Sequence, residues 1–227
     1  MLKLDYSYDL SIESAYIITL KNHTISERMS ARCQQSLAAL NMPYKVWDAF
    51  DGTSGTIIEP NHSKDATWTS WIKWVDKELS LTEVSVALSH ISLWAHCIEL
   101  DRPIIILEHD AIMLKELRDH PVTGIIHYLG SYEQAKKGWP VLITPPHATN
   151  GNNYHFICRA HAYSIDPWAA KNALSYVIKY GICESLDIML RSDIIPAIQL
   201  GLYAYDESDI ANTTIVGRKK TMDGKER

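Results

Sequence analysis

The hydrophobic pattern of the chain is clearest at 104–110, where Ile104-Ile105-Ile106-Leu107 precedes Glu108-His109-Asp110. An unbroken, largely β-branched apolar run predicts a strand buried on both faces of a parallel sheet. Open α/β sheets bind ligands just outside the carboxyl ends of their strands. On a continuing strand Glu108 and Asp110 would point the same way, and a divalent metal would relieve their repulsion. The alternative is a strand that ends in a solvated polar turn.

The same pattern divides the rest of the chain into strands and helices. A helix is expected at 80–99, where Ser80 and Glu83 have the spacing of a capping box and the apolar residues share one face. Ser89 falls opposite that face. The other expected elements are strands at 15–20, 44–50, 125–129, 141–144, 155–165 and 194–205, helices at 26–40 and 168–180, and short segments at 115–120 (helix-like) and 185–191. Their order predicts an α/β fold, a mostly parallel sheet flanked by helices.

Size and composition fit one large α/β domain. The chain has 227 residues, of which 46% are hydrophobic and 22% charged. We expect a single domain over 1–227, with 1–14 as an N-terminal extension and 217–227 as a mobile basic tail. The net charge of -5 gives no global attraction to nucleic acid or an anionic membrane. Because no signal-peptide core or membrane-length apolar run is present, the expected location is cytoplasmic.

Three further features each leave two interpretations open. Arg28 and Arg32 share one side of a helix and could bind a pyrophosphate or form a solvated face. His90 lies on the flank of its helix, as a partly exposed side chain or as a functional one. On a helix the tryptophans would form one stripe, serving either as core or as an aromatic platform for a sugar ring or a base. These are Trp68, Trp71 and Trp74.

Several segments, taken in chain order, resemble one known family. The most specific is Ala87–Trp94 with its Leu88-Ser89-His90, followed by Ile106–Ala111 with Glu108-His109-Asp110. These motifs are similar to those of glycosyltransferase family 25, which includes lipooligosaccharide galactosyltransferases and collagen galactosyltransferase-like domains. The resemblance covers roughly residues 15–212. Weaker matches are 15–22, 26–40, Tyr44, Asp51-Gly52, 81–83, 163–174, 186–187 and 206–210.

The resemblance implies a GT-A-like, Rossmann-related fold and a metal-dependent transfer with inversion. A hexose-type sugar would pass from a nucleotide-sugar donor, expected to be a UDP-sugar, to a hydroxyl acceptor. The implied metal, Mn²⁺ or Mg²⁺, is expected on Asp110. The general base is expected to be Asp187, with Asp209 and Glu207 as alternatives. The donor-binding residues implied are Leu20, Asn22, Arg28, Ser89, His90, Glu108 and His109.

Two departures from the family pattern leave the acceptor open. His109 stands where the family has an aspartate, and the Trp-rich stretch and the Gly/Asn loop at 147–153, a candidate lid, match nothing specific. The expected acceptor is a saccharide, such as an envelope glycan. A modified DNA base, as used by virus-encoded sugar transferases, is the second hypothesis. The third is a non-catalytic module that binds a sugar or nucleotide.

Overall fold

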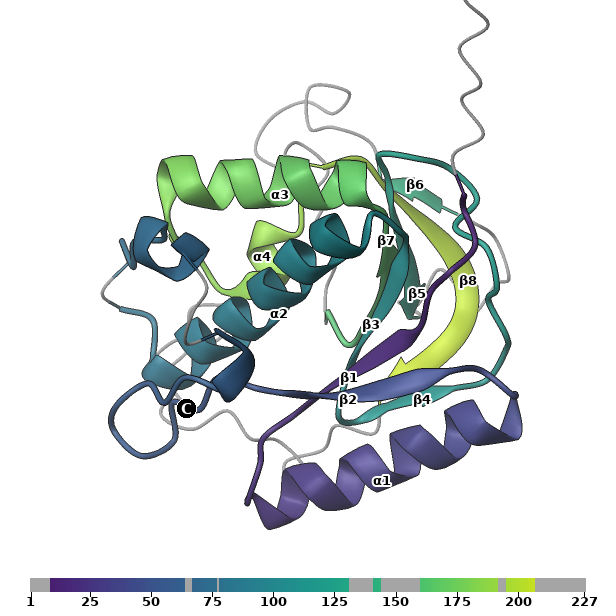
Figure 1. Cartoon of the computed structure of the whole chain (residues 1–227), viewed down its shortest axis with the longest axis horizontal. Coiled ribbons are helices and arrows are strands. Elements are labelled where there is room, and N and C mark those ends of the chain that lie inside the picture. The colour runs from purple at the N-terminus through teal and green to yellow at the C-terminus, as the bar shows by residue number, and fades with distance from the viewer. Residues whose placement is uncertain are drawn as a thin grey trace, which may run out of the picture.

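The strands join in one sheet, in the order β2-β1-β3-β7-β5-β8-β4, with β6 also paired to β8 (Figure 1). The computed structural model describes residues 9–63, 67–76, 78–130, 141–143, 160–191 and 195–206. Its strands are β1 Ala15–Thr19, β2 Tyr44–Asp48, β3 Ile104–Glu108, β4 Ala111–Met113, β5 Ile126–Gly130, β6 Val141–Ile143, β7 Ala162–Ile165 and β8 Ala197–Asp206. Its helices are α1 Thr24–Ala39, α2 Leu81–Leu100, α3 Pro167–Tyr180 and α4 Leu186–Met189, with 3-10 turns η1 Asn61–Ser63 and η2 Thr67–Trp71.

The sheet is mixed, which corrects the expectation of a mostly parallel one. β1 runs parallel to β2 and β3, and β5 runs parallel to β8. β7 is antiparallel to both β3 and β5, and β4 and β6 are antiparallel to β8. The apolar run of β3 could not reveal this, because helices on both faces bury a strand whatever the direction of its neighbours.

Helices cover both faces of the sheet and leave the apolar part of β3 fully buried. Ile104 and Ile106 belong to the core on the side of α2, α3 and α4. Ile105 and Leu107 belong to the core on the side of α1, where they share a cluster with Cys33. Figure 1 shows α1 on one side of the sheet and the other three helices on the opposite side. The predicted burial of this strand on both faces is therefore confirmed, with the alternation that a strand imposes.

The predicted helix at 80–99 is α2, and its predicted capping box is present. The Ser80 hydroxyl accepts a hydrogen bond from the backbone N of Glu83 at 3.2 Å, and the Glu83 carboxylate accepts one from the backbone N of Ser80 at 3.0 Å. α2 packs against both α3 and the sheet, so its polar side is buried as well as its apolar face. Ser89, expected opposite the apolar face, is 1% exposed.

Two local expectations are corrected. Residues 115–120 form no helix, because their backbone pairs with the N-terminal segment: Asp119 bridges Ser11, and His120 N donates to Leu10 O at 2.8 Å. The strand expected at 155–165 begins at Ala162 in the part that is described. Residues 155–159, the loop at 147–153 and the tail at 217–227 lie outside the described residues. No helix in the described ranges is long and apolar enough to cross a membrane.

The three tryptophans do not form a stripe on one helix. η2 ends at Trp71, whose side chain is 53% exposed. Trp74 lies beyond η2, pairs with Ile182 in an isolated bridge and packs partly buried against the core. Its Nε1 donates to the backbone O of Asp76. Trp74 therefore follows the core-packing interpretation, whereas Trp71 faces outward.

A pair of buried histidines lies near the amino end of β3, away from Glu108. His127 of β5 stacks on His120 with 4.0 Å between the ring centroids, and both are fully buried. His120 Nδ1 lies 3.1 Å from Ser164 Oγ, and its Nε2 lies 3.9 Å from Asp166. Burial lowers the pKa of His120 to about 4. Burial and the neighbouring His120 lower the pKa of His127 to about 3, although the charge of Asp166 acts to raise it. Both rings are therefore neutral at pH 7.

The histidine pair predicts a loss of stability in mild acid. In the unfolded chain each ring titrates near 6.5, so below that pH the unfolded state binds protons that the folded state does not accept. The free energy of unfolding should fall by about 2 kcal/mol per histidine between pH 7 and pH 5. His127→Phe removes one of these titrations, and in urea melts its stability should fall by about 2 kcal/mol less over this range than that of the wild type. An unchanged pH dependence would contradict the assignment.

Candidate active site

The order of the first strands creates a topological switch point between β1 and β3. From β1 the chain passes through α1 to β2 on one side, and it returns through α2 to β3 on the other side of β1. Figure 1 shows these two helices on opposite faces. Ile18 pairs with Glu108 in register, so Leu20 and Asp110 follow the two strands at the same end. Open α/β sheets bind ligands at such a point.

Glu108 and Asp110 diverge, which corrects the expectation that they point the same way. β3 ends at Glu108, and His109 and Asp110 form a turn because the chain leaves to pair β4 with β8. Glu108 lies beside His90 of α2, with 3.4 Å between Oε1 and Nε2. Asp110 is only 7% exposed. Burial, together with the negative charge of Asp110, raises the pKa of Cys33 of α1 to about 12. The two carboxylates thus lie at one strand end, with Glu108 towards α2 and Asp110 near enough to α1 to act on Cys33.

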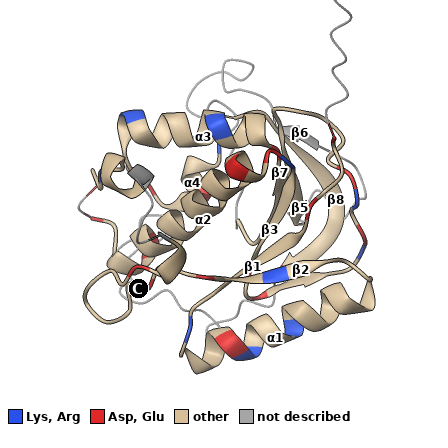
Figure 2. Cartoon of the chain, viewed as in Figure 1, with Lys and Arg blue, Asp and Glu red and all other residues tan. Residues whose placement is uncertain are grey.

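Two more carboxylates act on Glu108. Its side chain is 28% exposed. Burial, followed by the negative charges of Asp187 and Asp206, raises the pKa of Glu108 to about 8. Asp187 lies in the first turn of α4, and Asp206 ends β8 opposite Ala111. Figure 2 shows most of the other charged residues on helices and loops. The carboxyl end of β3 is therefore a concentrated acidic site that would favour a cation.

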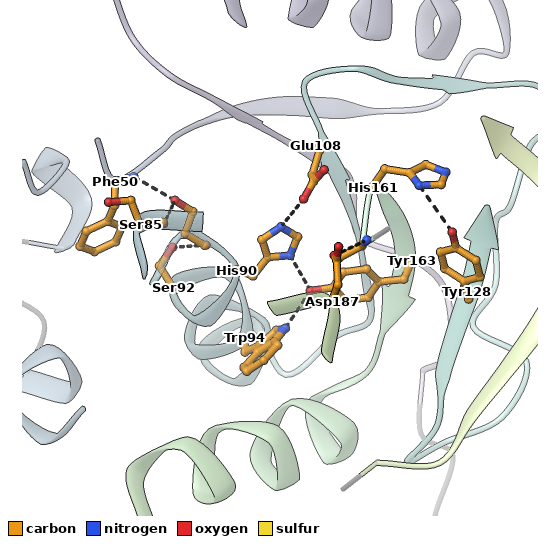
Figure 3. Close-up of polar contacts among 12 residues, drawn as sticks. Phe50, Ser85, His90, Ser92, Trp94, Glu108, Tyr128, His161, Tyr163 and Asp187 are labelled. Carbon is orange, nitrogen blue, oxygen red and sulfur yellow. Dashed lines mark hydrogen bonds and ion pairs between the residues drawn. The ribbon is translucent and has the colours of Figure 1, made fainter. Parts of the chain in front are cut away.

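His90 and Tyr163 lie beneath this site (Figure 3). The Nδ1 atom of His90 lies 2.9 Å from the hydroxyl of Tyr163, which also accepts a hydrogen bond from Nε1 of Trp94 at 2.9 Å. Burial, against the charge of Asp187, lowers the pKa of His90 to about 3. His90 is fully buried, so it contacts Glu108 from below rather than facing solvent.

Ser89 of α2 fixes the segment that follows β2. Its hydroxyl accepts a hydrogen bond from the backbone N of Phe50 at 3.0 Å and donates one to Ser85 O at 2.7 Å. Close by, a Cβ on Gly52 would lie 2.4 Å from the backbone O of Leu81 at the start of α2. This close approach explains the glycine of the Asp51-Gly52 turn. The donor contact expected of Ser89 stays a prediction.

The loop after β1 holds further residues expected to bind the donor. Leu20 is 8% exposed, whereas Asn22 is exposed and adopts a left-handed conformation with φ 62. The backbone N of Asn22 donates to the Glu27 carboxylate at 2.9 Å, so the first turn of α1 braces the loop. Arg28 lies on the exposed face of α1. Their contact with a donor likewise stays a prediction.

The structure brings together three of the predicted site residues, His90, Glu108 and Asp187. His109 lies in the turn after β3, and Asp209 lies outside the described residues. Asp206 and Tyr163 join the site although the sequence did not single them out. The acidic run that begins at Asp206 could have indicated this residue as part of a charged site. No local pattern could have indicated Tyr163 as a site residue, because only the antiparallel pairing of β7 with β3 places it under Glu108.

A comparison with protein families decides the assignment. The model of glycosyltransferase family 25, described as an LPS biosynthesis protein, matches residues 12–136, more than half of the 227 residues. The chain belongs to glycosyltransferase family 25. It is therefore a glycosyltransferase, and a donor and an acceptor of sugar are its substrates. A search of curated proteins gives no match.

The part that matches family 25 covers β1 to β5, including the switch point and Glu108. Asp187 and Asp206 lie beyond that part, and their place beside Glu108 follows from the fold. Of the acidic cluster, Glu108 thus lies in the part of the chain that matches the family, whereas the two aspartates come from the part that follows it.

The raised pKa of Glu108 predicts that its carboxylate destabilises the metal-free protein at high pH. The folded state keeps a proton that the unfolded state releases above about 4.5, so stability falls as the pH rises from 4.5 towards 8. Glu108→Gln should therefore raise the free energy of unfolding at pH 8, with EDTA present, by on the order of 1–2 kcal/mol, and by less at pH 5.

The matched control is Glu99→Gln, which changes a carboxylate on α2 that is 74% exposed. This control should show no such pH-dependent gain in urea melts. A Glu108→Gln protein no more stable than the wild type at pH 8 would contradict the raised pKa.

Proposed function

We propose that the chain is a metal-dependent hexosyltransferase that moves a sugar from a nucleotide-sugar donor to a saccharide hydroxyl, with inversion, on a GT-A-like fold. The observation that carries this is the acidic cluster of Glu108, Asp187 and Asp206 at the carboxyl end of β3 in a family 25 chain. Such a cluster lies where an α/β sheet binds a nucleotide. It supplies negative charge for a cation and a carboxylate for proton transfer.

The side chains at the site fit a hard divalent cation such as Mn²⁺ or Mg²⁺. In the ranges described, no group of three or more His, Cys, Asp or Glu side chains could hold a metal ion by itself. Magnesium is usually bound through one or two carboxylates together with substrate phosphates and water, which suits this arrangement. Asp110 would be the direct ligand, with Glu108 assisting. A bound metal would neutralise charge on the diphosphate leaving group.

Asp187 is our proposed general base. Its Oδ1 accepts a hydrogen bond from the backbone N of Ala160 at 3.0 Å, and such a bond favours the ionised carboxylate that a base requires. Its effect on the pKa values of Glu108 and His90 indicates that it lies close to both. Inversion needs one group to take the proton from the acceptor hydroxyl. Asp209, with Glu207, is the alternative.

The donor would lie at the switch point between β1 and β3. Leu20, Asn22 and His109 follow these strands at the same end of the sheet. Arg28 would reach the phosphates from α1, since a guanidinium suits phosphate oxygens. A UDP-sugar is the expected donor. The net charge of -5 gives no support to a DNA acceptor, which would need an electrostatic surface for phosphates.

Asp110→Ala should abolish metal-dependent donor binding. Calorimetric titration with a panel of nucleotide sugars, with and without Mn²⁺, should give one donor that binds the wild type only with metal. The matched control is Asp119→Ala, which removes an exposed aspartate paired in a bridge with Ser11. Binding without metal, or an unchanged Asp110→Ala protein, would contradict the metal role.

Asp187→Asn should lower kcat by about 10²–10⁴-fold, because general-base catalysis contributes on that scale. The donor Kd should change little, since the asparagine oxygen can still accept from the backbone N of Ala160. Release of the nucleotide during transfer to a glycan acceptor measures kcat. If Asp187→Asn keeps its kcat and Asp209→Asn loses it, the base is Asp209 instead.

A further inference from the structure

Two hydrogen bonds between buried side chains, followed by a longer polar contact, lead to Glu108 from the core (Figure 3). Trp94 Nε1 lies 2.9 Å from the Tyr163 hydroxyl, which lies 2.9 Å from His90 Nδ1. His90 Nε2 then lies 3.4 Å from Glu108 Oε1. The side chains of Tyr163 and His90 are fully buried, and that of Trp94 is 2% exposed. No solvent therefore reaches the Tyr163 hydroxyl or the ring nitrogens of His90.

The chemistry of the three side chains fixes where the protons lie. The indole N–H of Trp94 can only donate, so the Tyr163 oxygen accepts from it. Tyr163 has one proton of its own, and among the residues that the structure describes the acceptor within reach is His90 Nδ1. If Nδ1 carried a proton, the Tyr163 hydroxyl would accept twice and its own proton would be buried without an acceptor, which costs about 1–3 kcal/mol. Tyr163 therefore donates to Nδ1, and the ring proton lies on Nε2.

We propose that Tyr163, supported by Trp94, is a positioning residue that holds His90 as the Nε2–H tautomer, so that the ring N–H lies on the side of Glu108, whose Oε1 is 3.4 Å from Nε2. Neither ring nitrogen is then available to bind a metal or to take a proton from substrate. His90 instead orients the Glu108 carboxylate, in the way that groups behind metal ligands do. This last step rests on the proposed function of Glu108, whereas the tautomer does not.

The tautomer is measured directly by long-range ¹H–¹⁵N correlation spectra of protein labelled with ¹⁵N-histidine, at pH 7 with EDTA. The His90 signals are assigned by their absence in His90→Gln. In the wild type we expect a protonated Nε2 and an unprotonated, hydrogen-bonded Nδ1. A proton on Nδ1, or on both nitrogens, overturns the inference, and this result needs no variant of Tyr163 to fold.

Two variants separate the effect of Tyr163 from that of Glu108. In Glu108→Met the ring should keep its proton on Nε2, because Tyr163 still donates to Nδ1. In Tyr163→Phe the Nδ1 signal should move to that of a nitrogen without a hydrogen bond, or the ring should become a mixture of tautomers. If Glu108→Met changes the tautomer and Tyr163→Phe leaves the His90 signals unchanged, Glu108 alone sets the ring, and the inference fails.

Tyr16→Phe is the matched control. Tyr16 is 1% exposed, and its hydroxyl lies 3.1 Å from Nε2 of another histidine, His96, outside the site. This variant also loses a buried hydroxyl that contacts a histidine ring, so it shows how the removal of such a hydroxyl affects the protein when the site itself is unchanged. The signals of His90 should not move in Tyr16→Phe.

The consequence for the site is measured with Mn²⁺ alone, by the loss of its free-ion paramagnetic resonance signal. Tyr163→Phe should bind Mn²⁺ about tenfold more weakly than the wild type and Tyr16→Phe, on the scale of groups that support metal ligands. Unchanged affinity in Tyr163→Phe overturns the positioning role. If the wild type binds no Mn²⁺, the metal part of the proposed function fails, and the wild-type spectrum still decides the tautomer.

Discussion

The enclosure of β3 between two layers of helices is the constraint on which the site depends. Its apolar residues are fully buried, and they alternate between the core of α1 and the core of α2, α3 and α4. Glu108 is the next residue of that strand, so it emerges at the edge of the core with little water around it. Burial and the charges of Asp187 and Asp206 raise the pKa of its carboxyl group to about 8, so at pH 7 the group keeps its proton in the absence of a cation. The fold thus creates an unfavourable concentration of negative charge, which a cationic ligand would relieve.

The topology of the sheet also determines where this negative charge lies. Because β1 lies between β2 and β3, and α1 and α2 lie on opposite faces, the chain diverges at the carboxyl ends of β1 and β3. The loop after β1 and the turn after β3 therefore face one another across the switch point. We propose that this arrangement offers a place for a nucleotide beside the acidic cluster. The acidic cluster and the switch point therefore lie at the same end of the sheet, although they arise from different features of the fold.

The sequence was most informative where the structure depends on local pattern. The burial of 104–107, the capping box at Ser80 and the order of the first elements all follow from short-range spacing. Non-local pairing was out of reach: nothing in residues 162–165 says that β7 runs antiparallel to β3, and this pairing places Tyr163 beneath Glu108. The direction of the Asp110 side chain was predicted wrongly for the same reason. The chain turns after β3 because β4 pairs with the distant β8.

We propose that the carboxyl ends of β1 and β3 hold the donor and its metal. The most direct test is anomalous diffraction at the manganese edge from crystals of the protein grown with Mn²⁺ and UDP. We expect a manganese peak at the Asp110 carboxylate, with the diphosphate between the loop after β1 and the turn after β3. A peak bound by other residues, or a nucleotide at the amino ends of these strands, would contradict it.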